Sequence, residues 1–144
     1  MARPHHRTQW AAQFALASEL CKRDYQVALT LGNHPIVDLM VQSPSGKQFS
    51  IDVKGLYTRN FWIVKPKERE DLFYVFVYVP KDQPNQFFIL TQEEAAKAVQ
   101  QNWDHYCTRH GLPKSDALCP ENRLPGVEWK TAESYRDAWD KLPA

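Results

Sequence analysis

The sequence contains no uninterrupted apolar run of the roughly 20 residues that a membrane-spanning helix requires. It also lacks a stretch resembling a secretory signal peptide, because no long apolar run follows the basic start Met1–Arg7. Its three cysteines are odd in number and widely spaced, which does not suggest a disulfide framework. These absences predict a reduced, cytoplasmic protein without a membrane segment, in which Met1–Arg7 forms a loose arm.

Net charge is another quantity of which the sequence has little. The formal value is +1 at pH 7, so a basic field over the whole surface is excluded and any nucleic-acid binding must come from a local patch. There is no internal repeat and no low-complexity segment. Hydrophobic residues make up 43% of the 144 positions, which is enough for a core and argues against global disorder. The length predicts a single domain over residues 1–144.

The first half of the chain reads as one helix followed by strands. Helical spacing of apolar residues predicts a helix over about Thr8–Arg23 whose buried face carries Trp10, Phe14, Ala17, Leu20 and Cys21. The turn signal Ser43–Gly46 predicts a hairpin between the second and third strands. The almost continuously apolar segment Leu72–Val79 predicts an interior strand buried on both faces. We expect strands over Tyr25–Leu31, Ile36–Gln42, Lys47–Lys54, Phe61–Val64, Leu72–Val79 and Gln86–Leu90.

The second half predicts helices after the last strand. Thr91 and Glu94 have the spacing of a capping box, which predicts a helix that ends near Cys107. Prolines and glycines between Gly111 and Gly126 predict a long irregular loop, and a last short helix is expected over about Thr131–Leu142. The sequence therefore predicts an α/β protein with a mixed sheet flanked by helices. Its core spans about residues 8–107, and its irregular C-terminal extension about residues 108–144.

Two acidic residues and a lysine form the most informative constellation. On a strand, Asp52 and Lys54 point to the same face, with roughly 7 Å between their Cα atoms. A hairpin that closes near Gly46 brings Asp38, in the middle of the preceding apolar strand, next to Asp52. Two adjacent carboxylates repel each other unless a cation or proton lies between them, and hard oxygen ligands suit magnesium or manganese. The alternative is a solvated strand face with a weak ion pair.

Three segments together resemble the PD-(D/E)xK superfamily, which includes restriction endonucleases and Holliday-junction resolvases. They are WAAQFALASELCKRDYQV, HPIVDLMV and FSIDVKG, within roughly Trp10–Pro80. The resemblance implies a restriction-endonuclease-like fold and a metal-dependent endonuclease that cuts DNA or, less readily, RNA. It implies that Asp38, Asp52 and the backbone carbonyl of Val53 hold Mg²⁺, for which Mn²⁺ can substitute. Lys54 would help to activate the attacking water, and a homodimer is compatible with the family.

The sequence departs from the family pattern on the first helix. Many small relatives carry a glutamate where this chain has Gln13, whose amide oxygen is a weaker and uncharged ligand. We expect the amide of Gln13 to point toward Asp38, Asp52 and Lys54, because a buried amide needs hydrogen-bond partners. The substitution motivates an alternative function: a catalytically weak or inactive module that binds nucleic acid or a protein partner.

One basic cluster lies close to these residues in the sequence. It predicts contacts with phosphate groups, and its members are Arg59, Lys65, Lys67 and Arg69. The alternative for this cluster is a solvated loop whose charge is balanced by Glu68 and Glu70. A third reading of the whole chain is a small immunity or regulatory protein in which the Asp-x-Lys pattern is incidental.

Overall fold

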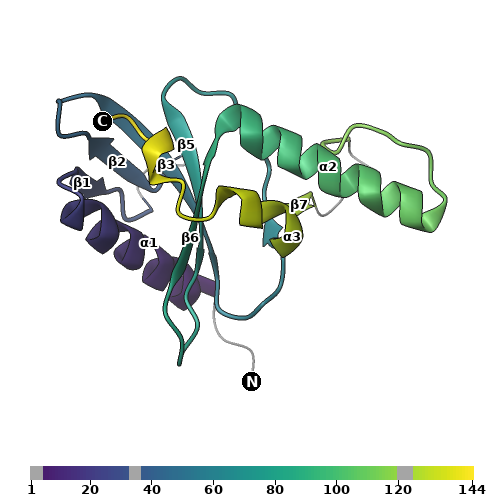
Figure 1. The fold of residues 1–144 in the computed structure, drawn as a ribbon, viewed down its shortest axis with the longest axis horizontal. Helices are drawn as coiled ribbons and strands as arrows, with labels where there is room; N and C mark the ends of the chain where they lie inside the picture. The colour runs from purple at the N-terminus through teal and green to yellow at the C-terminus, as the bar shows by residue number, and fades with distance from the viewer. Residues whose placement is uncertain (1–4, 33–36, 120–124) are drawn as a thin grey trace.

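The computed structural model describes residues 5–32, 37–119 and 125–144 (Figure 1). The expectations for residues 1–4, for Pro35 and Ile36, and for the middle of the C-terminal loop lie outside these ranges. The expected loose arm was wrong for His5–Arg7, which belong to the first helix. The elements follow the predicted order of one helix, a run of strands and a second long helix. The larger elements are α1 (His5–Lys22), β1 (Gln26–Leu29), β2 (Leu39–Gln42), β3 (Gln48–Leu56), β5 (Leu72–Tyr78), β6 (Gln86–Thr91) and α2 (Gln92–His110).

The central sheet is mixed and has five strands in the order β1-β2-β3-β5-β6. β3 pairs with β2 in antiparallel and with β5 in parallel orientation, and β5 pairs in antiparallel orientation with β6. The prediction that Leu72–Val79 forms an interior strand is confirmed, since β5 has a neighbour on each side and buries residues of both faces. Apolar residues at every position of a strand require cover on both faces, and the fold provides it.

The helices α1 and α2 lie on opposite sides of the sheet (Figure 1). Two hydrophobic clusters of buried residues accompany them, one on each face. α1 packs over one face, where Leu16 and Leu20 meet Ile51 and Val53 of β3. α2 packs over the other face, where Ala95 and Val99 belong to the same cluster as Tyr74 and Phe76 of β5 and Phe88 of β6. Among the described residues no helix is long and apolar enough to cross a membrane.

The buried face of α1 differs from the predicted one. Ala12, Gln13, Leu16 and Leu20 are buried, whereas Phe14 is 53% exposed and Cys21 is exposed. Trp10 and Phe14 stack on each other with their ring centroids 5.5 Å apart. The helix is thus rotated so that leucines, Ala12 and Gln13, rather than the aromatic side chain of Phe14, face the sheet.

Gly55 of β3 explains why small residues of α1 face the sheet. A Cβ atom at Gly55 would lie 2.7 Å from the Cβ of Ala12 and 3.1 Å from the backbone oxygen of Thr8. Carbon atoms that close overlap strongly, so any side chain at this position would push the helix away. The close approach of α1 to β3 therefore depends on a residue without a side chain.

The β2–β3 hairpin follows the predicted turn, but its first strand, β2, begins later than predicted. Gly46 donates a backbone hydrogen bond to the Ser43 carbonyl, and its φ of 95° suits glycine. β2 begins at Leu39, which pairs with Ile51, so Asp38 precedes the strand instead of lying at its middle. The expectation of a central position was wrong, because the pairing of β2 with β3 begins at Leu39, one residue after Asp38.

The predicted capping box is confirmed, whereas the expected last helix is not continuous. The Thr91 side chain accepts from the Glu94 backbone N–H and the Glu94 side chain accepts from that of Thr91. The expected helix over Thr131–Leu142 is broken into α3 (Trp129–Ala132) and the 3-10 turns η1 (Glu133–Tyr135) and η2 (Trp139–Lys141), because Asp137 adopts a φ of 52°. The fourth strand, β4 (Trp62–Ile63), pairs with β7 (Gly126–Val127) outside the main sheet.

Candidate functional site

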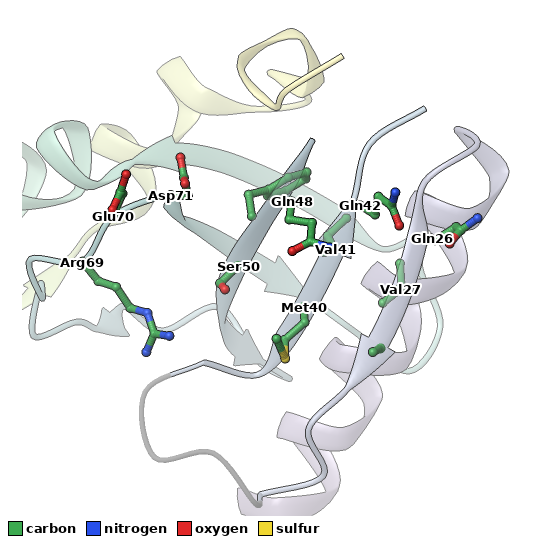
Figure 2. Close-up of a pocket in the computed structure, with 12 residues that line it drawn as sticks. Gln26, Val27, Met40, Val41, Gln42, Gln48, Ser50, Arg69, Glu70 and Asp71 are labelled. Carbon is green, nitrogen blue, oxygen red and sulfur yellow. The ribbon is translucent and has the colours of Figure 1, made fainter. Parts of the chain in front are cut away.

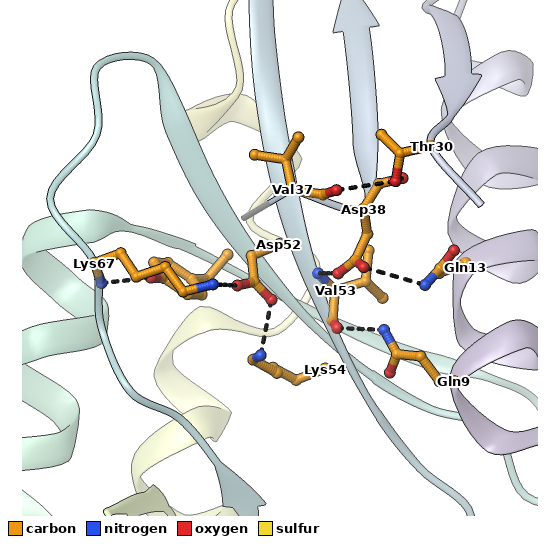
Figure 3. Close-up of polar contacts among 10 residues, drawn as sticks. Gln9, Gln13, Thr30, Val37, Asp38, Asp52, Val53, Lys54 and Lys67 are labelled. Carbon is orange, nitrogen blue, oxygen red and sulfur yellow. Dashed lines mark hydrogen bonds and ion pairs between the residues drawn. The ribbon is translucent and has the colours of Figure 1, made fainter. Parts of the chain in front are cut away.

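The Asp38 carboxylate is fixed by donors that carry no charge (Figure 3). Its Oδ2 accepts a hydrogen bond of 2.7 Å from the Val53 backbone N–H, and its Oδ1 accepts one of 3.3 Å from Nε2 of Gln13. Val53 lies beyond the last residue of β3 that pairs with β2, so the carboxylate satisfies an N–H group that the ladder leaves over. Burial raises the pKa of Asp38, and the nearby Asp52 carboxylate adds to the rise.

The Asp52 carboxylate is bound by two ammonium groups. Nζ of Lys54 lies 3.0 Å from Oδ1 of Asp52, and Nζ of Lys67 lies 3.4 Å from Oδ2. Only 3% of the Asp52 side chain is exposed, compared with 31% for Lys54 and 39% for Lys67. Oδ1 is buried and receives no hydrogen bond, because the ion pair with Lys54 has a geometry that does not form one.

Lys67 is held at this site through its backbone. Its N–H donates a 2.8 Å hydrogen bond to the hydroxyl of Tyr74, which is fully buried and pairs with Asp52 across the parallel β3–β5 ladder. Two residues further on, Gln92 of α2 accepts from the Arg69 N–H at 2.6 Å and donates to the Arg69 carbonyl. The sequence predicted Lys67 as a phosphate contact, and the structure places its ammonium group on Asp52.

Gln9 is a residue of the site that the sequence analysis missed. Its Nε2 donates a 2.7 Å hydrogen bond to the backbone carbonyl of Val53, and it lies one helical turn before Gln13 on α1 (Figure 3). The expectation that the amide of Gln13 points toward Asp38 is confirmed by the hydrogen bond between them. A pair of glutamines four residues apart would have been the available signal, because such residues share one helix face.

The remaining members of the predicted basic cluster do not gather at the two carboxylates. The guanidinium of Arg59 lies over the ring of Trp129, 3.8 Å from its centroid. The Lys65 side chain is exposed, and Arg69 lines a groove on the sheet surface. The cluster is thus one patch in the sequence but several separate positions in the fold.

The groove beside Arg69 lies on the face of β1–β3 that α1 does not cover (Figure 2). Its volume is about 430 Å³. Uncharged polar residues and one exposed methionine dominate its floor, while Arg69, Glu70 and Asp71 form one wall; the floor includes Gln26, Met40, Gln42, Gln48 and Ser50. Ser50 precedes Asp52 by two residues on β3, so the groove and the Asp52 side chain share this face of the strand.

The chemistry of the donors fits a hard divalent cation. Asp38, Asp52 and the Val53 carbonyl offer only oxygen atoms, the ligands that Mg²⁺ and Mn²⁺ prefer, and the buried Oδ1 of Asp52 lacks a hydrogen bond. Across the residues that the structure describes, no three histidine, cysteine or acidic side chains come together, so a cation here would rely on two carboxylates. Two lysines already balance the charge of these carboxylates.

Comparisons of the chain with protein-family models, with curated proteins and with solved structures gave no match.

Proposed function

We propose that the protein is a metal-dependent nuclease that hydrolyses phosphodiester bonds in DNA. The observation that carries the proposal is the gathering of Asp38, Asp52 and Lys54 at the end of the β2–β3 hairpin, where the Asp38 carboxylate accepts from the Val53 N–H and the Lys54 ammonium pairs with Asp52. This is the constellation that the resemblance to the PD-(D/E)xK superfamily implies. Asp38, Asp52 and the Val53 carbonyl would hold Mg²⁺, or Mn²⁺ in its place.

A bound Mg²⁺ would lower the pKa of a water molecule and neutralise charge on the phosphate. The chain's own residues supply orientation. The Val53 N–H and the Gln13 amide fix the Asp38 carboxylate, so its oxygen atoms need not reorganise during the reaction. The Lys54 ammonium is partly exposed and reaches both Asp52 and solvent, which suits a group that holds the attacking water or stabilises charge on the phosphate.

The groove on the open face of β1–β3 supports a polymeric substrate. Arg69 offers a positive charge for a phosphate group, and the glutamines of the floor offer donors and acceptors for base edges. The acidic wall residues Glu70 and Asp71 would repel the phosphate groups of a bound DNA strand. The DNA strand would therefore cross this wall near Arg69. DNA remains the proposed substrate, ahead of RNA, and a homodimer remains compatible with the proposal.

A second function is favoured by the charge of the site. The two lysines on Asp52 neutralise both carboxylates without a metal, and Gln13 adds no third carboxylate. A module that binds nucleic acid without cleaving it would need no more than this.

Cleavage of supercoiled plasmid and of labelled single-stranded DNA, each with Mg²⁺, Mn²⁺ or EDTA, tests the proposed nuclease. We expect cleavage that requires the divalent cation and falls on the order of 10²–10³-fold in Asp52→Asn, the loss typical of one electrostatic stabiliser. The control is Asp82→Asn, an exposed aspartate in the β5–β6 loop. DNA binding in a mobility-shift assay, without cleavage in the presence of any of the metals, would contradict the nuclease proposal and favour the binding module.

A further inference from the structure

Asp52 contacts two lysines from different parts of the fold, and only one of them belongs to the Asp-x-Lys pattern. Lys54 is on β3 itself, two residues from Asp52, whereas Lys67 comes from the segment that leads into β5. The two ammonium groups divide the carboxylate between them, one at each oxygen. Both also lie close enough to Asp38 to favour the charged form of its carboxylate.

The position of Lys67 is a built feature of the fold. The Tyr74 hydroxyl anchors its backbone from the buried face of β5, and Gln92 anchors Arg69 two residues later. The side chain between these anchors is 39% exposed and is the more exposed of the two lysines on Asp52. Its ammonium can therefore leave Asp52 while its backbone stays in place.

We propose that Lys67 is a tethered counter-ion: it binds Asp52 when no divalent cation is present, competes with that cation, and moves to a substrate phosphate when the cation binds. The proposal deepens the proposed function and rests on the same metal site. Lys67 acts here as a positioning residue that couples metal binding to nucleic-acid binding.

Charge balance gives the reason for the exchange. Two carboxylates and two ammonium groups sum to zero, so a divalent cation added to this set leaves two positive charges in excess. Like charges a few ångströms apart repel each other. The ammonium group of Lys67 moves most readily, because its side chain is the more exposed of the two. A phosphate diester is the anion that restores the balance, which makes metal and DNA binding mutually reinforcing.

Mn²⁺ affinity of the full chain, measured by calorimetry and by electron paramagnetic resonance, tests the exchange without reference to catalysis. Lys67→Met keeps the length of the side chain and removes its charge, and we expect it to bind Mn²⁺ on the order of tenfold more tightly than the unmodified protein. Lys65→Met is the matched control, because Lys65 is exposed in the same segment, and its Mn²⁺ affinity should stay within twofold of the unmodified value. An unchanged or weaker affinity in Lys67→Met overturns the proposal.

A second variant protects the test against misfolding of the first. Tyr74→Phe keeps Lys67 and its charge but removes the hydroxyl that accepts from the Lys67 N–H. We expect Mn²⁺ affinity to rise several-fold, because the ammonium competes less well for Asp52 once its backbone is released. DNA should tighten Mn²⁺ binding in the unmodified protein and lose this effect in Lys67→Met, whereas equal coupling in both proteins contradicts the exchange.

The outcomes separate this proposal from the nuclease itself. Metal-dependent cleavage by the unmodified protein, together with an unchanged Mn²⁺ affinity in Lys67→Met, overturns the exchange and leaves the nuclease standing. Tighter Mn²⁺ binding in Lys67→Met, without cleavage by any form of the protein, supports the exchange and contradicts the proposed nuclease activity. The absence of Mn²⁺ binding in all forms overturns both.

Discussion

The two carboxylates of the candidate site are held by opposite means. Asp38 is fixed from α1 and from the β3 backbone by neutral N–H groups, whereas Asp52 is bound by the charged ends of two lysines. Neutral donors fix geometry without changing the charge of the site. Ammonium groups set the charge and can be exchanged for another cation. One side of the site therefore defines its shape, and the other defines its charge.

The largest effect is expected where the close packing of α1 on β3 fixes the shape of the site. Gly55→Ala would place a Cβ 2.7 Å from that of Ala12 and push α1 away from β3, which would separate Gln9 and Gln13 from the site. We expect the free energy of unfolding to fall by about 1–3 kcal/mol, the usual cost of overpacking, and Mn²⁺ affinity to fall with it. Urea denaturation and calorimetry measure the two quantities.

A second substitution controls for the general cost of changing Gly55. Ala12→Gly removes the other Cβ of the clash, so the double variant should recover part of the stability, less the roughly 1 kcal/mol that glycine costs inside a helix. It should also recover Mn²⁺ affinity. A double variant no better than the sum of the two single changes would show that this contact does not position α1.

The next prediction adds a negative charge beside Asp38, on the side of the site that is held by neutral donors. Gln13→Glu would place a carboxylate beside Asp38, and without metal the two like charges should lower the melting temperature. With Mn²⁺ the added ligand should tighten binding and raise any cleavage by about tenfold, equivalent to about 1.4 kcal/mol. Melting temperature and cleavage, each with and without Mn²⁺, measure the change.

Ser18→Glu is the matched control for Gln13→Glu, since it adds the same charge to an exposed position of α1. It should alter neither quantity in a metal-dependent way. Indifference of Gln13→Glu to Mn²⁺ in both assays would remove support for the nuclease and favour the binding module.

Local patterns predicted those parts of the fold whose cause is local. The apolar run of β5, the turn at Gly46 and the capping box at Thr91 each depend on residues a few positions apart, and all three are observed. The prediction of the buried face of α1 was wrong. Hydrophobicity favoured Trp10 and Phe14, whereas the packing is decided by Gly55, which is far away in the chain.

The site divides in the same way. The alternation along β3 was enough to place Asp52 beside Lys54, and the hairpin was enough to bring Asp38 near them. Gln9 reaches Val53 across 44 residues, and Lys67 reaches Asp52 through a segment of no regular structure. Spacing places Gln9 on the same helix face as Gln13, but the contacts with Val53 and Asp52 depend on how whole elements pack.

The smallest expected effect concerns a carboxylate–lysine pair outside the candidate site. Glu94 of α2 pairs with Lys141, which, like Lys67, approaches from a distant segment. Burial acts to raise the pKa of Glu94, but hydrogen bonds from Lys141 and Thr91 outweigh it, so its pKa lies below the ordinary value. Its charged form therefore stabilises the fold above the pKa of the unfolded chain, and this contribution is lost as pH falls through the lower pKa of the folded state.

Glu94→Gln keeps a side chain that can complete the capping box and removes the charge. We expect a loss of about 0.2–1 kcal/mol in the free energy of unfolding at pH 7, the range for partly exposed ion pairs, and a shrinking difference as pH falls below about 4. Urea denaturation at pH 7 and pH 3, with and without Mn²⁺ at pH 7, measures both dependences. Mn²⁺ should not change the effect of Glu94→Gln, whereas it should change that of Lys67→Met, because only the lysine on Asp52 shares its carboxylate with a metal. An equal response of the two variants to Mn²⁺ would show that the cation acts on the protein's charge in general and not at Asp52.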